Sequence, residues 1–328
     1  MENTINWLLE GPSWLQYRTR IDLLHQPVTE PQLISLRRKI FDDQQVQALL
    51  NELSAWPGEV LKSHKSAGHL YHKLNFLVDI GFRADDPGMD RVIDVVLEHQ
   101  SPEGPFQSLL NIPIHFGGTG KDSWSWTLCD APNLVYAMLK LGLGTDPRIQ
   151  RAVDYLLQLV RSNGWPCITS PDLGKFHGPG RRDDPCPYAN LIMLKVLGQI
   201  PELCASTPAQ TGIETLLSLW NQRRDQHPYL FHMGTDFCKL KVPFVWYDLV
   251  HVLEVLSHFP WVSGETRHQE MLNILKLKAN PLGQYTPESV WSAWKDWEFG
   301  QKKVPARWLT LIALRILQKL PPDEIDHL

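Results

Sequence analysis

The sequence predicts a single all-α domain over residues 1–328, in which six pairs of helices close into an α/α toroid. Three observations lead to this fold class. Apolar segments recur about every 60 residues, amphipathic segments lie between them, and no stretch alternates in the way that a strand does. A helix that is apolar nearly all round must be covered on both sides, whereas a helix with one apolar stripe has a face in water. The alternation therefore predicts inner helices shielded by outer ones.

The six apolar segments are the predicted inner helices. They begin at Trp14, His69, Cys129, Cys186, Trp246 and Arg307, and successive starts lie 55, 60, 57, 60 and 61 residues apart. A period of this length is typical of repeat architectures. The spacing therefore predicts one structural unit of about 60 residues, used six times.

The amphipathic segments are the predicted outer helices. Residues 89–100, 146–160 and 213–220 each place their apolar side chains at intervals of three and four, which gives a single buried stripe. In the second of these segments Asp146 is followed by Pro147, a typical helix cap and first turn.

The composition narrows the class of protein. Hydrophobic residues make up 43% of the chain and charged residues 21%, and the formal net charge of -4 gives no electrostatic basis for binding nucleic acid. No run of about 18 apolar residues and no secretory leader is present, which predicts a cytoplasmic protein without a membrane span. The five cysteines, an odd number, fit a reducing compartment. A protein partner or a homo-oligomer stays possible.

The turns between the predicted helices carry a family resemblance. In EHQSPEGPF, the residues Gln100, Gly104 and Phe106 resemble the glutamine-to-aromatic repeat of squalene and other triterpene cyclases. From Trp14 to Leu320 the chain resembles the toroid family of terpenoid cyclases and protein prenyltransferase β-subunits. The resemblance implies an isoprenoid-handling enzyme that binds a long apolar molecule in the central cavity.

Polar and aromatic residues near the starts of the inner helices are the candidate site residues. In a toroid these helix starts point their free N–H groups toward one mouth of the cavity. The candidates for catalysis are Asp130, Asp248 and His251. The candidates for substrate binding are Trp246, Tyr247, Trp308, Tyr71 and His72, because aromatic walls bind apolar chains and stabilise cations.

Three cysteines are candidate ligands of a zinc ion. Cys129 and Cys186 begin neighbouring inner helices, and Cys167 lies in the turn that leads to the second of them. His177 or Asp184 completes the predicted tetrahedral set. The prenyltransferase β-subunits hold zinc with an aspartate and a cysteine two residues later, a pair that Asp184 and Cys186 match. Their histidine ligand, at the start of the next inner helix, has no counterpart here. When the inner-helix starts are aligned, Asp248 falls at that position and His251 lies one turn further along.

Two other hypotheses stay open. Class II terpene cyclases protonate their substrate with the middle aspartate of a DxDD motif, which this chain lacks, and Asp130 is the residue beside the corresponding position. Asp130 is therefore the acid of a possible proton-initiated cyclase. The other hypothesis is a non-catalytic binding or scaffold toroid with structural zinc. For each cysteine the alternative role is a small buried core residue.

Overall fold

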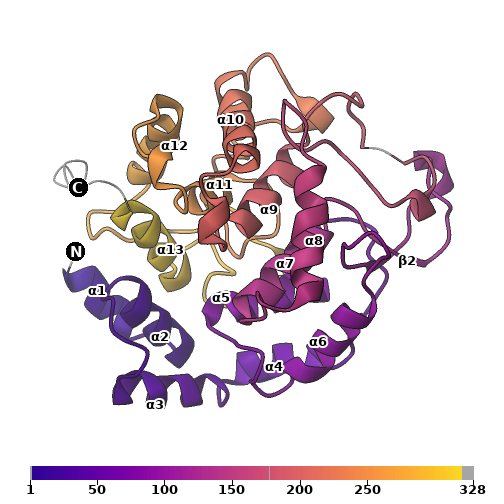
Figure 1. Ribbon diagram of the computed structural model, residues 1–328. Helices are drawn as coiled ribbons and strands as arrows, with labels where there is room; N and C mark the ends of the chain where they lie inside the picture. The colour runs from indigo at the N-terminus through magenta and orange to yellow at the C-terminus, as the bar shows by residue number, and fades with distance from the viewer. Residues whose placement is uncertain (1, 177, 320–328) are drawn as a thin grey trace.

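The computed structural model describes residues 2–176 and 178–319 and is mostly helical, as Figure 1 shows. These residues form thirteen α-helices and one small antiparallel sheet. No helix among them combines the length and the hydropathy that a bilayer crossing requires.

All six predicted apolar segments form helices. They are α2 (Ser13–Asp22), α5 (Leu70–Ile80), α7 (Ala131–Lys140), α9 (Pro187–Leu197), α11 (Leu249–Leu256) and α13 (Arg307–Gln318). Helix α2 packs against α5, α5 against α7, α7 against α9, α9 against α11, α11 against α13, and α13 against α2. These six helices, here called the cyclic helices, thus contact one another in closed order.

Six of the seven remaining described helices, all but α6, pack against the cyclic helices. The seven are α1 (Glu2–Leu9), α3 (Pro31–Ile40), α4 (Gln44–Leu53), α6 (Met89–Glu98), α8 (Pro147–Gln158), α10 (Thr207–Asn221) and α12 (Thr266–Lys276). Helix α4 contacts α5, α8 contacts α7, α10 contacts α9, and α12 contacts α11. The predicted single stripe is confirmed in α6, where the buried side chains are Met89, Val92, Ile93, Val96 and Leu97. The predicted cap of α8 is also confirmed, because the Asp146 side chain accepts the N–H of Arg148.

A small sheet departs from the purely helical expectation. Strand β1 (Ser108–Leu110) pairs antiparallel with β2 (Ser123–Ser125), so that Leu109 lies opposite Trp124. Each strand has three residues, too few for the alternation that identifies a strand in a sequence.

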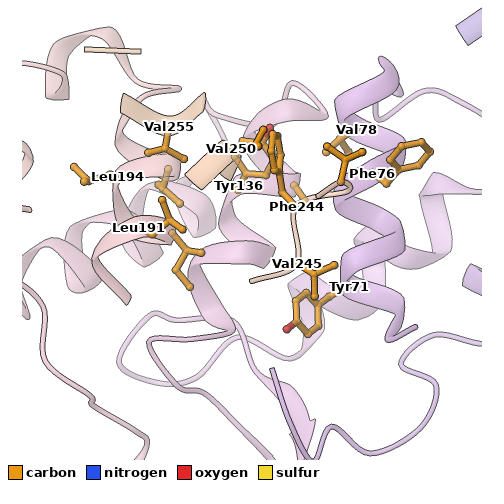
Figure 2. Packing of buried hydrophobic residues seen from close by; sticks show 14 of the residues in the cluster. Tyr71, Phe76, Val78, Tyr136, Leu191, Leu194, Phe244, Val245, Val250 and Val255 are labelled. Atoms are coloured by element: carbon orange, nitrogen blue, oxygen red, sulfur yellow. The ribbon is translucent and has the colours of Figure 1, made fainter. Parts of the chain in front are cut away.

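The segment before α11 enters the space between the cyclic helices. The ring of Phe244 stacks on His251 of α11 with centroids 4.7 Å apart, and the Lys195 Nζ of α9 lies 5.5 Å from the Phe244 ring. The Tyr188 hydroxyl donates a hydrogen bond of 3.0 Å to the Val245 carbonyl. Figure 2 shows Phe244 and Val245 among the buried side chains of the cyclic helices. These two residues thus occupy interior space where the sequence suggested a substrate.

The first and last described helices lie side by side. Helix α1 packs against α13, and the Nε of Arg307 donates a hydrogen bond of 3.0 Å to the Trp7 carbonyl. Figure 1 shows this contact at the meeting of the indigo and yellow ends of the chain.

Candidate functional site

Two asparagines fix the cysteines that precede α7 and α9. Asn133 Nδ2 donates to the Cys129 carbonyl at 3.0 Å, and Asn190 Nδ2 donates to the Cys186 carbonyl at 2.8 Å. Asn190 also bonds the backbone N–H and carbonyl of Trp165, and the N–H of Cys186 bonds the same carbonyl. The turn before α9 is therefore locked to the helix, which sets the position of Cys186.

Cys186 is the N-cap residue of α9, and 4% of its surface is exposed. A hydrogen bond from the Cys129 thiol is the largest cause that lowers the pKa of Cys186. Burial opposes this effect, whereas the N–H groups of Ala189 and Tyr188 and the charge of His64 lower the pKa of Cys186 further. Helix starts and neighbouring cations are the usual settings of reactive thiolates.

Cys129 is the protonated partner of this pair. Its hydrogen bond with Cys186 is the largest cause, and burial the second, that raises the pKa of the Cys129 thiol well above its ordinary value. Burial also raises the pKa of Cys167 to about 12. Of the three cysteines in this region, Cys186 is therefore the one whose thiol pKa is lowered.

His64 forms an ion pair with Asp130 beside the two sulfurs. His64 Nδ1 lies 2.6 Å from Asp130 Oδ1, and the other carboxylate oxygen accepts the hydroxyl of Thr127 at 2.9 Å. Burial disfavours the charged form of His64, but the charge of Asp130 and the hydrogen bond to it outweigh burial and raise the pKa of His64. An imidazole paired with a carboxylate thus lies near the Cys186 sulfur.

Tyr71 and His72 of α5 hold the backbone of His64. The Tyr71 hydroxyl donates to the His64 carbonyl at 3.3 Å, and His72 Nε2 lies 2.9 Å from the same oxygen. Burial lowers the pKa of His72 to about 3, so its ring is neutral. Tyr71 and His72, both predicted to bind substrate, therefore fix the position of His64.

An aromatic pocket of about 440 Å³ opens near the start of α11. Its apolar lining contains Tyr229, Leu230, Phe231, Phe237, Trp246 and Tyr247, and its polar lining contains Lys65, His232, Asp236, Lys241 and Asp248. Aromatic walls with a few charged groups are typical of small-molecule sites. Two of the residues predicted to bind substrate, Trp246 and Tyr247, thus line this pocket.

Trp246 joins the aromatic pocket to the sulfur cluster, the name used here for Cys129, Cys186, His64 and Asp130. Its ring lies 4.3 Å from that of Tyr188 and parallel to that of His64, with centroids 6.5 Å apart. Phe231 stacks on it at 5.2 Å, and the Lys65 Nζ lies 4.9 Å from its centre. A molecule bound against the far face of Trp246 would therefore be separated from the His64 imidazole by the Trp246 ring.

The backbone at the edge of the aromatic pocket adopts a rare conformation. Tyr229 and Leu230 have φ angles of 53° and 62°, in the left-handed region that costs energy for residues other than glycine. The Tyr229 hydroxyl also donates to the carbonyls of Arg181 and Asp184, which ties this edge to the loop before Cys186. Such strain concentrates at functional sites.

Asp248 is an unusual carboxyl in the wall of this pocket. It caps α11 by accepting the N–H of His251 at 3.0 Å, while its Oδ2 atom has no hydrogen-bond partner among the described residues. Burial raises the pKa of Asp248 to about 7 and lowers that of His251 to about 3. Asp248 therefore exchanges a proton near neutral pH, whereas His251 stays neutral and places Nδ1 2.9 Å from the Trp246 carbonyl.

Trp308 lies in a different part of the core. Its ring packs edge-on against Trp14 at 5.6 Å and Phe76 at 5.7 Å, and 1% of its surface is exposed. These contacts are those of a residue that locks helices together.

The predicted zinc ligands are only partly brought together. Cys129 and Cys186 share a hydrogen bond, but Cys167 Sγ accepts the N–H of Gly178 and Asp184 Oδ2 accepts the N–H of Arg181. Within residues 2–176 and 178–319, no three His, Cys, Asp or Glu side chains are grouped as metal ligands would be. His177 lies outside the described residues. The described donors do not fit the predicted set, and zinc stays a prediction.

The sequence interpretation missed His64, Tyr188 and the two asparagines. The pattern Cys-x-x-x-Asn occurs at 129–133 and at 186–190, in equivalent units of the repeat, and marks both anchored cysteines. His64 carries no such signal, because it lies in the connection before α5 and reaches Asp130 only through the fold.

No family profile and no curated protein sequence matches this chain. Among solved structures, one described as the crystal structure of a protein from Actinoplanes is similar over 94% of this chain and 89% of its own. The sequence identity is 13% and the TM-score is 0.42, so this likeness assigns neither family nor function.

Proposed function

We propose that the chain is an enzyme that binds an apolar, isoprenoid-like molecule in the aromatic pocket and acts on it with the Cys186 thiolate. One observation carries the proposal: the Cys186 sulfur, the His64 imidazole and the Asp130 carboxylate lie together beside a pocket with aromatic walls. A nucleophile, a base and a group that orients the base are the parts that covalent catalysis requires.

The proposed architecture is the α/α toroid of terpenoid cyclases and prenyltransferase β-subunits. The closed order of contacts among the cyclic helices supports it, as does the packing of a second helix against most of them. In this arrangement Asp130, Cys186 and Asp248 all lie at N-caps, which places the chemistry at one mouth of the toroid.

The roles of the three residues follow from their hydrogen bonds. The Cys186 thiolate attacks an electrophilic carbon of the substrate, and the leaving group departs with the electron pair of the broken bond. His64 in its charged form donates a proton to that leaving group. The neutral His64 then takes a proton from a water molecule that attacks the same carbon, so that the carbon–sulfur bond breaks and Cys186 leaves as the thiolate. Asp130 holds the imidazole through Nδ1, which leaves Nε2 for the substrate.

The lining of the pocket indicates the substrate class. Tyr229, Phe231 and Trp246 offer an apolar surface, while Lys65 and Lys241 offer positive charge at the same pocket. An apolar chain with an anionic head group, such as an isoprenoid diphosphate, matches both features. The substrate then occupies the mouth, since Phe244 and Val245 already lie in the interior.

The other two hypotheses have less support. The two carboxylate oxygens of Asp130 face protein groups, His64 Nδ1 at 2.6 Å and the Thr127 hydroxyl at 2.9 Å, whereas an acid that protonates an alkene must point its proton at the substrate. Zinc is favoured by one observation, the contact between the Cys129 and Cys186 sulfurs. Elemental analysis of untagged protein grown with added zinc distinguishes the two uses of these sulfurs: one equivalent of zinc supports a metal site, and a trace supports the free thiolate.

The proposed function is tested with farnesyl diphosphate and, as the uncharged probe, farnesol. We expect saturable quenching of tryptophan fluorescence by the diphosphate and time-dependent release of its leaving group. Cys186→Ser should bind within about twofold of wild type and lose turnover by on the order of 10³-fold. Cys204→Ser is the matched control, because the Cys204 thiol donates to the carbonyls of Leu197 and Ile200 and does not line the aromatic pocket.

Two results would overturn parts of this proposal. Full turnover by Cys186→Ser would remove Cys186 from the chemistry. Absence of binding for both probes would exclude the isoprenoid class and favour a scaffold.

A further inference from the structure

A second pocket lies at the opposite ends of the cyclic helices. It has a volume of about 270 Å³, and all six cyclic helices or the residues directly after them line it. Asp79 comes from the end of α5, Lys140 is the last residue of α7, and Lys319 follows α13. The carboxyl ends of the helices thus meet here, and this charged pocket contains none of the residues of the sulfur cluster.

Arginines pair with most of the carboxylates of the charged pocket. Arg315 lies 3.0 Å from Asp22 and 2.7 Å from Glu254, and Arg18 lies 2.6 Å from Asp22. The third carboxylate, Asp79, accepts a hydrogen bond from the Tyr136 hydroxyl. The negative groups of this pocket are therefore satisfied within the protein.

Lys140 has no corresponding partner. No hydrogen bond and no ion pair within 4.0 Å joins its amine to any residue in the described part of the chain. Burial is the largest cause that lowers the pKa of Lys140 to about 8, and the charges of Arg18 and Arg315 act in the same direction. The protein thus leaves one amine of the charged pocket without an acceptor.

A second amine lies behind the pocket wall. Lys195 is 5% exposed, its Nζ has no hydrogen-bond partner among the described residues, and it lies 4.1 Å from the ring of Tyr136. Burial lowers the pKa of Lys195 as well. The partial negative charge of helix carboxyl ends offsets some of this positive charge. Within the described residues, however, no carbonyl oxygen of these helix ends accepts a hydrogen bond from the Lys140 amine.

We propose that the charged pocket binds a small tetrahedral oxyanion, free phosphate or the phosphate of a small phosphomonoester, with Lys140 as its principal contact. The volume admits a phosphate group and a few further atoms. Lys319 and His25 line the same pocket and offer additional positive groups. This site is independent of the proposed thiol chemistry.

The affinity should depend on pH through Lys140. The charges of Arg18, Arg315, Asp79 and Asp22 act on this amine, Glu254, His258 and Lys319 line the same pocket, and Lys195 lies behind its wall. The pKa of Lys140 is about 8, so its positive charge is present below that pH and is lost above it. Sulfate, whose charge is constant between about pH 6 and about pH 9, should therefore bind more weakly as the pH rises.

Calorimetric titration of the full chain with phosphate, glycerol phosphate and sulfate tests the site. We expect saturable binding that Lys140→Met weakens by about tenfold or more, because a hydrogen bond between charged groups is lost. Lys140→Arg should restore part of the affinity. Lys303→Met, at an exposed lysine, is the matched control and should bind as wild type does.

The three probes and the variants give distinct results. Tight binding of glycerol phosphate with weak binding of phosphate indicates that the natural ligand is a phosphomonoester. Equal affinities for the two probes indicate that it is free phosphate. Absence of binding to the wild type at millimolar concentrations overturns the proposal. Equal affinities of wild type and Lys140→Met, with both proteins folded by thermal melting, overturn it too.

Discussion

The two ends of the cyclic helices differ in the charges that they hold. At the amino ends, the N-cap positions of three helices carry the groups that are or become anions, namely Asp130, Cys186 and Asp248. At the carboxyl ends, the cations Lys140 and Arg315 dominate. Helix dipoles favour this distribution, since amino ends stabilise negative charge and carboxyl ends positive charge.

The ends differ equally in how their charges are compensated. Arg315 at the carboxyl ends pairs with Asp22 and Glu254, and its charge lowers the pKa of both carboxyls although burial opposes this. At the amino ends, one Asp248 oxygen has no hydrogen-bond partner among residues 2–176 and 178–319, and burial raises the pKa of Asp248. The comparison indicates that the paired carboxylates at the carboxyl ends contribute to stability, whereas the buried Asp248 carboxyl at the amino ends lacks such compensation.

The largest expected effect is that of removing Arg315. Arg315→Met leaves Glu254 and Asp22 buried with one cation fewer, and we expect a loss of about 4 kcal/mol in the free energy of unfolding. Urea denaturation of the variant and the wild type measures this loss. The control Lys239→Met removes the exposed pair with Asp236 and should change stability by less than about 1 kcal/mol. Similar small losses for both variants would contradict a stabilising role of the carboxyl ends.

Phe244 separates the two ends, and its removal should cost somewhat less. Phe244→Ala deletes a ring that is 7% exposed and stacked on His251, which we expect to destabilise the protein by about 3 kcal/mol. The control is Phe116→Ala, because Phe116 is 62% exposed. A loss below about 1 kcal/mol for Phe244→Ala would mean that this segment is not a packed part of the interior.

Asp248 should make the amino ends sensitive to pH in the opposite direction from the carboxyl ends. The folded pKa of about 7 is above the unfolded value, so the stability linked to Asp248 is present below about pH 4 and is lost as pH rises through 7. Asp248→Asn keeps an N-cap acceptor and should raise stability above pH 7 by on the order of 1 kcal/mol or more. Melting curves at several pH values measure this. A gain that is equal at pH 5 would disprove the linkage.

The contribution of Glu254 and Asp22 to stability depends on pH in the opposite direction from that of Asp248. Their folded pKa values are lowered, so the stability that they contribute is present above the unfolded values near 4 and is lost as pH falls below them.

The smallest predicted effect is a shift in the titration of Cys186. Removing the imidazole in His64→Gln should raise the pKa of the Cys186 thiol, because the charge of His64 lowers it. The ultraviolet absorbance of the thiolate, taken as the difference from Cys186→Ser, follows this titration. Cys238→Ser serves as the control for a cysteine outside the cluster. An unchanged midpoint in His64→Gln would show that the two side chains are not coupled.

The sequence predicted the helices of this fold better than its site. Apolar periodicity is a local property, which is why the segments at Cys129 and Cys186 were recognised as helix starts and both are confirmed. The contact between their sulfurs follows from how α7 packs against α9. The position of His64 depends on a connection without periodicity, so no pattern in the sequence could place it beside Asp130.

The chemistry of individual residues was harder to predict than their place. Asp130 was recognised as a candidate acid, but its role depends on the imidazole that lies 2.6 Å away. No sequence pattern marks Lys140, because a lysine at the end of a helix usually points into water and only the convergence of six helix ends encloses it.

The closed order of helix contacts has a consequence for local unfolding. In a linear array of repeats the outermost units have one neighbour each and open first. Here α2 contacts both α5 and α13, and α13 contacts both α2 and α11, so neither is an outermost unit. Amide protons in α2 and α13 should therefore exchange with solvent as slowly as those in α7, and the six helices should open together rather than peel away from either end.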